Sequence, residues 1–189
     1  MPVKIIHFAE LTSTNDYAVN LIIKNDMSRE IDDMAILADV QTAGRGRLNG
    51  RVWVSMVGNF HCSYIINIEK LGISPGESSI ITDSAICSVR DMLIATTGDV
   101  DRISVKLPND ILINTHGGAE GLPSEGRKVA GVLVEVCYPF AVVGIGINLR
   151  NSPIIMAANI KDEFKILVKP RDLVDNLYEF LIAGISRDF

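Results

Sequence analysis

The stretch RKVAGVLVEVCYPFAVVGIGINL, from Arg127 to Leu149, predicts two strands, near residues 128–138 and 140–148. The second strand is apolar enough to be buried, although it contains the paired glycines of Gly144-Ile145-Gly146. A dinucleotide-binding fold needs a helix start directly after such glycines, and none follows here. The pair therefore gives no support to a Rossmann enzyme.

Hydrophobic periodicity on either side of this stretch predicts the other elements. They are a first strand, a helix near 14–24, strands near 34–40 and 52–68, a long helix near 77–96, strands near 102–106 and 110–114, and a last helix near 171–184. The last helix places its apolar residues along one face: Leu173, Leu177, Phe180, Leu181 and Gly184. The glycine-rich segment His116 to Gly126 is typical of a mobile hairpin tip. The predicted fold class is α/β (α+β), a mixed β-sheet flanked by helices.

Length and composition indicate one intracellular domain. The 189 residues are 48% hydrophobic, enough to bury one substantial core, so we expect a single domain over residues 1–189. A formal net charge of -5 argues against nonspecific nucleic-acid binding. The three cysteines, Cys62, Cys87 and Cys137, lack the spacing of a zinc site or a disulfide framework. Nothing resembles a signal peptide or a membrane span, so the predicted location is the cytoplasm.

A basic, glycine-rich loop, GRGRLNGRVW, occupies residues 44–53. Its three glycines allow the backbone to approach a ligand, and its three guanidinium groups match carboxylate or phosphate oxygens. The composition predicts a loop that wraps an anion. A solvated basic turn between two strands is the alternative. No Gly-Lys-Ser/Thr follows, so the loop is not a P-loop.

Other polar motifs adjoin the predicted strands and helices. Ser13-Thr14-Asn15-Asp16 precedes the first helix, where capping alone would explain it. Gln41-Thr42-Ala43 leads into the basic loop, and Lys106-Leu107-Pro108-Asn109-Asp110 separates two short strands. Lys128 lies at the start of one long strand, and Asn148 ends the next.

The order of these motifs resembles the biotin protein ligases, also called biotin-[acetyl-CoA-carboxylase] ligases. The matching pieces are Ser13-Thr14-Asn15, the run Gln41 to Arg47, Trp53, Lys106-x-Pro108-Asn109-Asp110, the run Lys128 to Glu135, and Gly144-x-Gly146-Ile147-Asn148. The resemblance covers the chain from about residue 6 to 149. It implies a catalytic domain with a fold like that of class II aminoacyl-tRNA synthetases.

The resemblance also implies a two-step reaction. The carboxylate of biotin attacks the α-phosphate of ATP, pyrophosphate leaves, and biotinyl-5′-AMP forms. The target lysine of a biotin carboxyl carrier protein then takes the biotinyl group. ATP and biotin are substrates, Mg²⁺ is the activator, and no bound prosthetic group is expected. Because two anions must meet, such a catalyst needs positioned cations more than a nucleophile.

Roles follow residue by residue from the resemblance. The residues expected at biotin are Ser13, Thr14, Asn15, Gln41, Gly44, Arg45, Gly46, Lys128 and Gly131. Those expected at ATP or the adenylate are Arg47, Arg51, Trp53, Lys106, Asn109 and Asn148. The expected catalytic residues are Lys128, Arg47 and Lys106. Asp110 is expected near Mg²⁺, or as an ordinary turn residue. An edge-strand lysine that opposes aggregation is the alternative for Lys128.

Three features depart from the commoner family pattern. The basic loop has one residue more before its last Gly-Arg, and Leu107 stands where tryptophan is usual. We also expect neither an N-terminal helix-turn-helix nor, after the helix near 171–184, the small C-terminal barrel.

Two alternative functions stay open. One is a lipoate ligase or octanoyl transferase of the same fold, and the other is a noncatalytic biotin or adenylate sensor. The five cations of the motifs favour catalysis, because a neutral biotin ring does not need them. A carrier protein is the expected partner, without nucleic acid or membrane, and a homodimer is left open.

Overall fold

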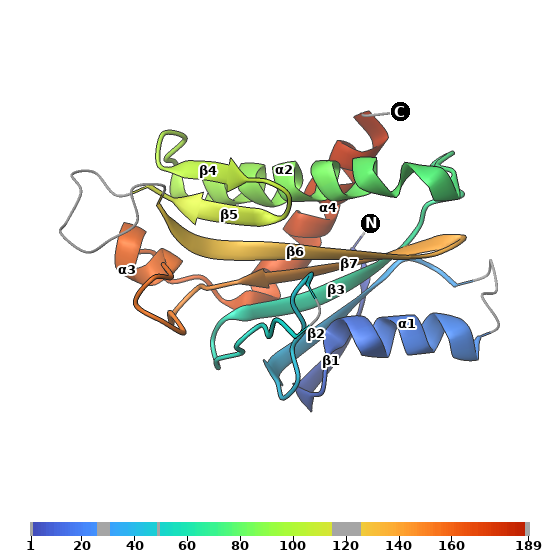
Figure 1. Ribbon diagram of the computed structural model, residues 1–189, viewed down its shortest axis with the longest axis horizontal. Coiled ribbons are helices and arrows are strands. Elements are labelled where there is room, and N and C mark those ends of the chain that lie inside the picture. The colour runs from blue at the N-terminus through green and yellow to red at the C-terminus, as the bar shows by residue number, and fades with distance from the viewer. Residues whose placement is uncertain (1, 26–30, 49, 115–125, 188–189) are drawn as a thin grey trace.

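A computed structural model describes residues 2–25, 31–48, 50–114 and 126–187 of the chain (Figure 1). Its seven strands are β1 (Lys4–Leu11), β2 (Met34–Gln41), β3 (Phe60–Asn67), β4 (Ile103–Lys106), β5 (Asp110–Ile113), β6 (Arg127–Cys137) and β7 (Phe140–Ile147). They form one sheet in the order β1-β2-β3-β7-β6-β5-β4. β1 and β2 are parallel, and every other neighbouring pair is antiparallel. The mixed sheet predicted from the sequence is confirmed.

Helices cover both faces of this sheet (Figure 1). They are α1 (Thr14–Lys24), α2 (Ser78–Thr97), α3 (Ile160–Phe164) and α4 (Val174–Arg187), with 3-10 turns η1 (Pro75–Glu77) and η2 (Pro170–Leu173). α2 and α4 pack against each other and against one face, and α1 packs against β2, β3 and β7 on the other. None of the helices in the described ranges is long and apolar enough to cross a membrane.

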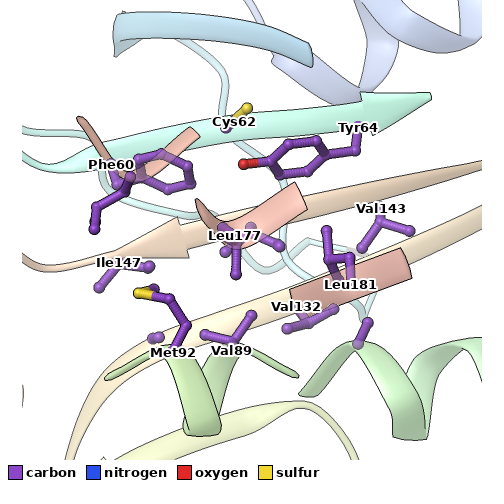
Figure 2. Close-up of a cluster of buried hydrophobic side chains, with 14 of the residues drawn as sticks. Phe60, Cys62, Tyr64, Val89, Met92, Val132, Val143, Ile147, Leu177 and Leu181 are labelled. Carbon is purple, nitrogen blue, oxygen red and sulfur yellow. The ribbon is translucent and has the colours of Figure 1, made fainter. Parts of the chain in front are cut away.

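The main core lies between the sheet and the helix pair α2 and α4. Alternate residues of β3 enter it, among them Phe60, Cys62 and Tyr64, because successive strand side chains point to opposite faces (Figure 2). Leu177 and Leu181 of α4 lie against them and are fully buried. Burial of one such side chain contributes roughly 1.5–3 kcal/mol. The other face can therefore hold a site without weakening this core.

The face under α1 changes character along β7. Phe140 and Val142 belong to the small apolar cluster beneath α1. The next two positions on the same face are Gly144 and Gly146, and Ser63 of β3 is the register partner of Gly144. Large side chains thus give way to glycine where α1 begins, and these glycines leave room for the side chains of Asn15 and Trp53 to lie against the sheet.

Most predicted elements are confirmed, two differ, and one short helix was not predicted. Only Phe60–Asn67 of the strand expected near 52–68 is a strand, because the chain turns at Gly58, which has a φ of 86°. The last helix starts at Val174, after the 3-10 turn that contains Leu173. The short helix α3 has too few residues for a periodic pattern and was not predicted. The predicted tip from His116 to Gly126 lies outside the described residues, except for Gly126.

Candidate active site

A cavity of about 380 Å³ lies over the glycine-bearing part of the sheet. It brings together most of the residues that the sequence singled out: Ser13, Thr14, Asn15, Gln41, Arg45, Gly46, Arg47, Arg51, Trp53, Lys106, Asn109, Asp110, Lys128 and Gly131. Gly44 and Asn148 do not line it. The motifs are far apart in the sequence, so the antiparallel pairing of β3, β7, β6 and β5 is what assembles them.

The inner end of the cavity is a network of uncharged polar side chains. Ser13 caps α1 by accepting a hydrogen bond from the backbone N–H of Asp16, and this places Thr14 and Asn15 against the sheet. The hydroxyl and backbone N–H of Thr14 donate to Gln41 Oε1 at 3.1 and 2.8 Å. Ser63 Oγ lies 2.5 Å from Asn15 Oδ1 and 2.7 Å from Thr14 Oγ1. This end suits a ligand group that both donates and accepts hydrogen bonds.

Glycines make room for these side chains on the floor of the cavity. A Cβ at Gly146 would come within 2.4 Å of the Trp53 ring, which lies over β7. A Cβ at Gly131 would come within 3.0 Å of Lys128 Nζ and 3.3 Å of the Trp53 ring. These glycines therefore let Trp53 and Lys128 lie close to the strand backbones.

Lys128 lies between a carboxylate and an aromatic ring. Its Nζ is 2.6 Å from Asp110 Oδ1 and 5.4 Å from the centre of the Trp53 ring. The β5–β6 pairing brings Lys128 and Asp110 to the same side of the cavity. The ammonium group is thus positioned before any ligand arrives.

The three arginines of the basic loop differ in their surroundings. Arg45 Nη2 lies 2.6 Å from Asp16 Oδ1 and 2.7 Å from Glu135 Oε2. The hydrogen bond with Glu135 raises the pKa of Arg45 further above its usual value. Arg47 and Arg51 also line the cavity and are exposed, and in the described ranges no carboxylate pairs with either. Arg47 and Arg51 are therefore available to contact an anion, as expected. At Arg45 the two neighbouring carboxylates obstruct that contact.

The basic loop has a narrow neck. The backbone N–H of Gly46 donates to Arg51 O at 2.8 Å, and that of Trp53 donates to Gly44 O at 2.9 Å. A Cβ at Gly44 would lie 2.6 Å from Trp53 O, so the two arms of the neck approach closely. Gly50 has a φ of 80°, a left-handed conformation that glycine adopts most readily. Gly50 thus supplies the turn that directs the chain into Arg51.

Asn148 is buried and does not line the cavity. Its Nδ2 donates to Ala158 O at 3.1 Å, and its Oδ1 lies 3.5 Å from Asn59 Nδ2. The expected contact of Asn148 with adenine stays a prediction. Asn59 was not identified from the sequence, although its Oδ1 accepts hydrogen bonds from the three backbone N–H groups of residues 149–151. The turn at Gly58 was the one signal for it.

Two further residues that were not identified from the sequence, Ser55 and His61, support Gln41. Ser55 Oγ accepts a hydrogen bond from the backbone N–H of Gln41 at 2.8 Å and lies 3.1 Å from His61 Nε2. Burial lowers the pKa of His61 to about 4. The imidazole is therefore neutral near pH 7 and adds no charge beneath the polar end of the cavity.

Asp110 is the residue that was expected to lie near Mg²⁺. No cluster of three or more His, Cys, Asp and Glu side chains suited to a metal ion occurs in the described part of the chain. Mg²⁺ in nucleotide sites is commonly bound through one or two carboxylates together with substrate phosphates and water. One carboxylate that lines the cavity next to cationic groups fits that pattern.

Two curated relatives of this chain are named as biotin ligases. The chain is 33% identical over 123 residues to the biotin--[acetyl-CoA-carboxylase] ligase of Paracoccus denitrificans, covering 62% of this chain and 45% of that protein. It is 30% identical over 147 residues to the corresponding ligase of Mycobacterium tuberculosis, covering 77% of this chain and 49% of that one. The chain thus spans about half the length of the curated relatives it matches.

Solved structures share the fold. The biotin protein ligase of Leishmania major, in complex with biotinyl-5-AMP, superposes with a TM-score of 0.79 at 24% identity, covering 99% of this chain and 76% of that one. The enzyme of Aquifex aeolicus, in complex with biotin and ATP, gives a TM-score of 0.73 at 24% identity, with 97% and 71% covered. Residues 8–150 match the model of the biotin/lipoate A/B protein ligase family. The chain belongs to the biotin/lipoate A/B protein ligase family.

Proposed function

We propose that the chain is the catalytic domain of a biotin ligase, which forms biotinyl-5′-AMP from biotin and ATP and transfers biotin to a lysine of a carrier protein. The observation that carries this proposal is the polarity of the cavity along its length. Thr14, Asn15 and Gln41 form its uncharged polar end, while Lys128 and Arg47 supply cations where a carboxylate would meet a phosphate. Relatives named as biotin ligases support the same assignment.

The polar end favours biotin over lipoate or octanoate. The ureido ring of biotin carries two N–H donors and a carbonyl acceptor, so it can satisfy Thr14, Asn15 and Gln41 in their network. An aliphatic acyl chain offers no hydrogen-bonding group to this end of the cavity, and a site built to hydrogen-bond its ligand disfavours an analogue that cannot do so. The network thus discriminates between the acids by hydrogen bonding.

In adenylation, the cations would allow two anions to approach. Lys128 is already held between Asp110 and Trp53, so its charge is placed before the substrates bind. Arg47 and Arg51 would close on the phosphates, and Lys106 lines the same cavity. Asn109 is fixed in place because its Nδ2 donates to Val132 O at 2.9 Å. Asp110 is the residue that would hold Mg²⁺, which screens phosphate charge when bound.

In the transfer step, the amine of the carrier lysine would attack the acyl carbon of the mixed anhydride and AMP would leave. This step needs no covalent enzyme intermediate. We propose a biotin carboxyl carrier protein as the partner and the cytoplasm as the location, since the relatives are named for acetyl-CoA carboxylase. No nucleic acid or membrane takes part in this scheme, and a homodimer is compatible with it.

Carrier labelling tests the whole reaction. The protein is incubated with ATP, Mg²⁺, a biotin carboxyl carrier domain and one acid at a time: biotin, lipoate or octanoate. Intact-mass spectrometry should show one added biotinyl group on wild-type carrier and none on a carrier whose target lysine is replaced by arginine. Labelling by lipoate or octanoate alone would assign the chain to the other acids of its family. Biotin binding without labelling or adenylate would support the sensor.

A further inference from the structure

Arg45 holds together three segments that are far apart in the sequence. Its guanidinium contacts Asp16 in the first turn of α1 and Glu135 near the end of β6, while its own backbone belongs to the neck of the basic loop. Nη2 lies 2.9 and 2.7 Å from the two carboxylate oxygens of Glu135. Hydrogen bonds in which both partners are charged are the strong ones among side-chain contacts.

The positive charge of Arg45 is already more than balanced by neighbouring carboxylates. One guanidinium faces two carboxylates, so Arg45, Asp16 and Glu135 together carry a formal charge of about -1 at pH 7. An incoming carboxylate or phosphate would have to approach those two carboxylates. Arg47 and Arg51 have no such partner in the described ranges. All three loop arginines line the cavity, and they divide into one that is held by carboxylates and two that are not in the described ranges.

The contacts of Glu135 extend to the polar end of the cavity. Glu135 Oε2 also accepts a hydrogen bond from Asn15 Nδ2 at 2.8 Å, and Leu133 O accepts another at 3.3 Å. Two acceptors on one side fix the orientation of the Asn15 amide and turn its Oδ1 toward Ser63. Arg45 thus fixes the carboxylate that orients Asn15.

The contacts of Arg45 also fix the loop neck. Arg45 forms an isolated antiparallel bridge with Val52, next to Trp53, whose ring lies on Gly146. Fastening Arg45 to β6 and α1 therefore seats the ring on the floor of the cavity. Arg47 and Arg51 lie beyond this point, so they can move toward a ligand while the neck keeps its place.

We propose that Arg45 is a positioning residue, which fastens the neck of the basic loop to α1 and β6 and orients Asn15 through Glu135, and that it is not an anion ligand. Its effect on substrates rests on the function proposed above. Its structural part does not, because the ion pair is present without any ligand. The first test is therefore made on the protein without substrates.

Trp53 is the one tryptophan of the chain and reports directly on the neck. Arg45→Met and Glu135→Gln should each shift its fluorescence emission to longer wavelength, because a loosened neck exposes the ring to water. Arg45→Lys should give a smaller shift. Arg47→Met should give none, and neither should Arg90→Met, which breaks an ion pair of similar exposure on α2. In a double-mutant cycle on urea unfolding, Arg45→Met and Glu135→Gln should be non-additive. Unchanged emission or additive losses would overturn the proposal.

Kinetics provide the second test. In pyrophosphate exchange, Arg45→Met and Glu135→Gln should each raise the KM for biotin about tenfold and leave kcat within about threefold, because ground-state fit is lost. Arg47→Met should instead lower kcat. A lowered kcat and raised KM for ATP in Arg45→Met, with Glu135→Gln near wild type, would make Arg45 an anion ligand and overturn the proposal. If no acid supports exchange in wild type, the proposed function fails, and the fluorescence and unfolding results decide the role of Arg45.

Discussion

The amide of Asn15 lies directly over Gly144, and a Cβ at that glycine would come within 2.0 Å of Asn15 Oδ1. Real Cβ atoms do not approach an oxygen so closely, so any larger residue must displace Asn15. Its Oδ1 is held by Ser63 and its Nδ2 by Glu135, which leaves little room for displacement. Gly144 is thus tied to the polar end of the cavity by simple steric exclusion.

Gly144→Ala should weaken biotin binding by about tenfold, corresponding to the roughly 1–3 kcal/mol typical of overpacking. Isothermal titration calorimetry with biotin measures the change. Gly76→Ala is the matched control, because a Cβ at Gly76 meets nothing within 4 Å. Equal biotin affinity in Gly144→Ala and wild type would show that Asn15 does not contribute to biotin binding.

Lys128→Met should lower the rate of adenylation far more than it weakens biotin binding. The charge of Lys128 is needed mainly where carboxylate and phosphate meet, and a positioned contact of this kind is worth roughly a hundredfold or more in rate. Pyrophosphate exchange gives the rate, and calorimetry gives the affinity. Lys128→Arg, which keeps the charge, should recover part of the rate. Equal factors for rate and affinity would make Lys128 a ground-state binding residue.

The basic loop from Thr42 to Arg51 should become more protected when an adenylate binds. Arg47 and Arg51, which no carboxylate balances in the described ranges, repel one another, and the glycines of the loop give the backbone many conformations until an anion binds. Amide hydrogen exchange, with and without a nonhydrolysable biotinyl adenylate, measures the protection. Equal protection in the two states would contradict closure of the loop.

Arg47→Gly should release biotinyl-5′-AMP, which would then label lysines indiscriminately, because closure keeps the anhydride from water. Arg47→Lys, which keeps the charge, should retain more of the biotinyl-5′-AMP. Labelling of a bystander protein measures escape of the adenylate. If Arg47→Gly retains the adenylate as well as wild type does, Arg47 takes no part in closing the loop.

His61 should make the protein less stable in mild acid. Its pKa is about 4 in the folded protein, below the ordinary histidine value of 6.5, so the unfolded chain takes up the proton first. The free energy of unfolding should therefore fall as the pH decreases from about 6.5 to about 4, by about 3 kcal/mol in total. Urea unfolding across this range should show a shallower dependence in His61→Gln. His7→Gln, at an exposed position, is the control. An unchanged slope in His61→Gln would show that His61 is not the group responsible.

The sequence predicted much of the fold because most elements carry a clear period. The runs that became α1, β2, β6 and β7 have capping residues or continuous apolar stretches, and their bounds agree within about two residues. The strand predicted near 52–68 is wrong before Phe60, where the valines lie on a loop. Those at 52, 54 and 57 are exposed, and Gly58 and Asn59 end the segment in a turn. Alternating apolar residues alone do not distinguish an exposed loop from a strand with one buried face.

The candidate site was largely predictable because its motifs contain unusual residues in a specific order. The sequence could not give the pairing of those residues across space. All three loop arginines were expected to contact an anion, Arg45 at biotin and the other two at the adenylate, and what sets Arg45 apart is Glu135, ninety residues away. Ser55, His61 and Asn59 support the site through hydrogen bonds between distant segments, which leave no local pattern.

Pyrophosphate exchange into ATP is the most direct test of the central claim, that this cavity activates biotin as an adenylate. The protein is incubated with ATP, Mg²⁺ and labelled pyrophosphate, and the label that enters ATP is counted with biotin, lipoate, octanoate or no acid. The account predicts exchange that depends on biotin and is lost in Lys128→Met. Exchange with lipoate or octanoate and none with biotin would contradict it.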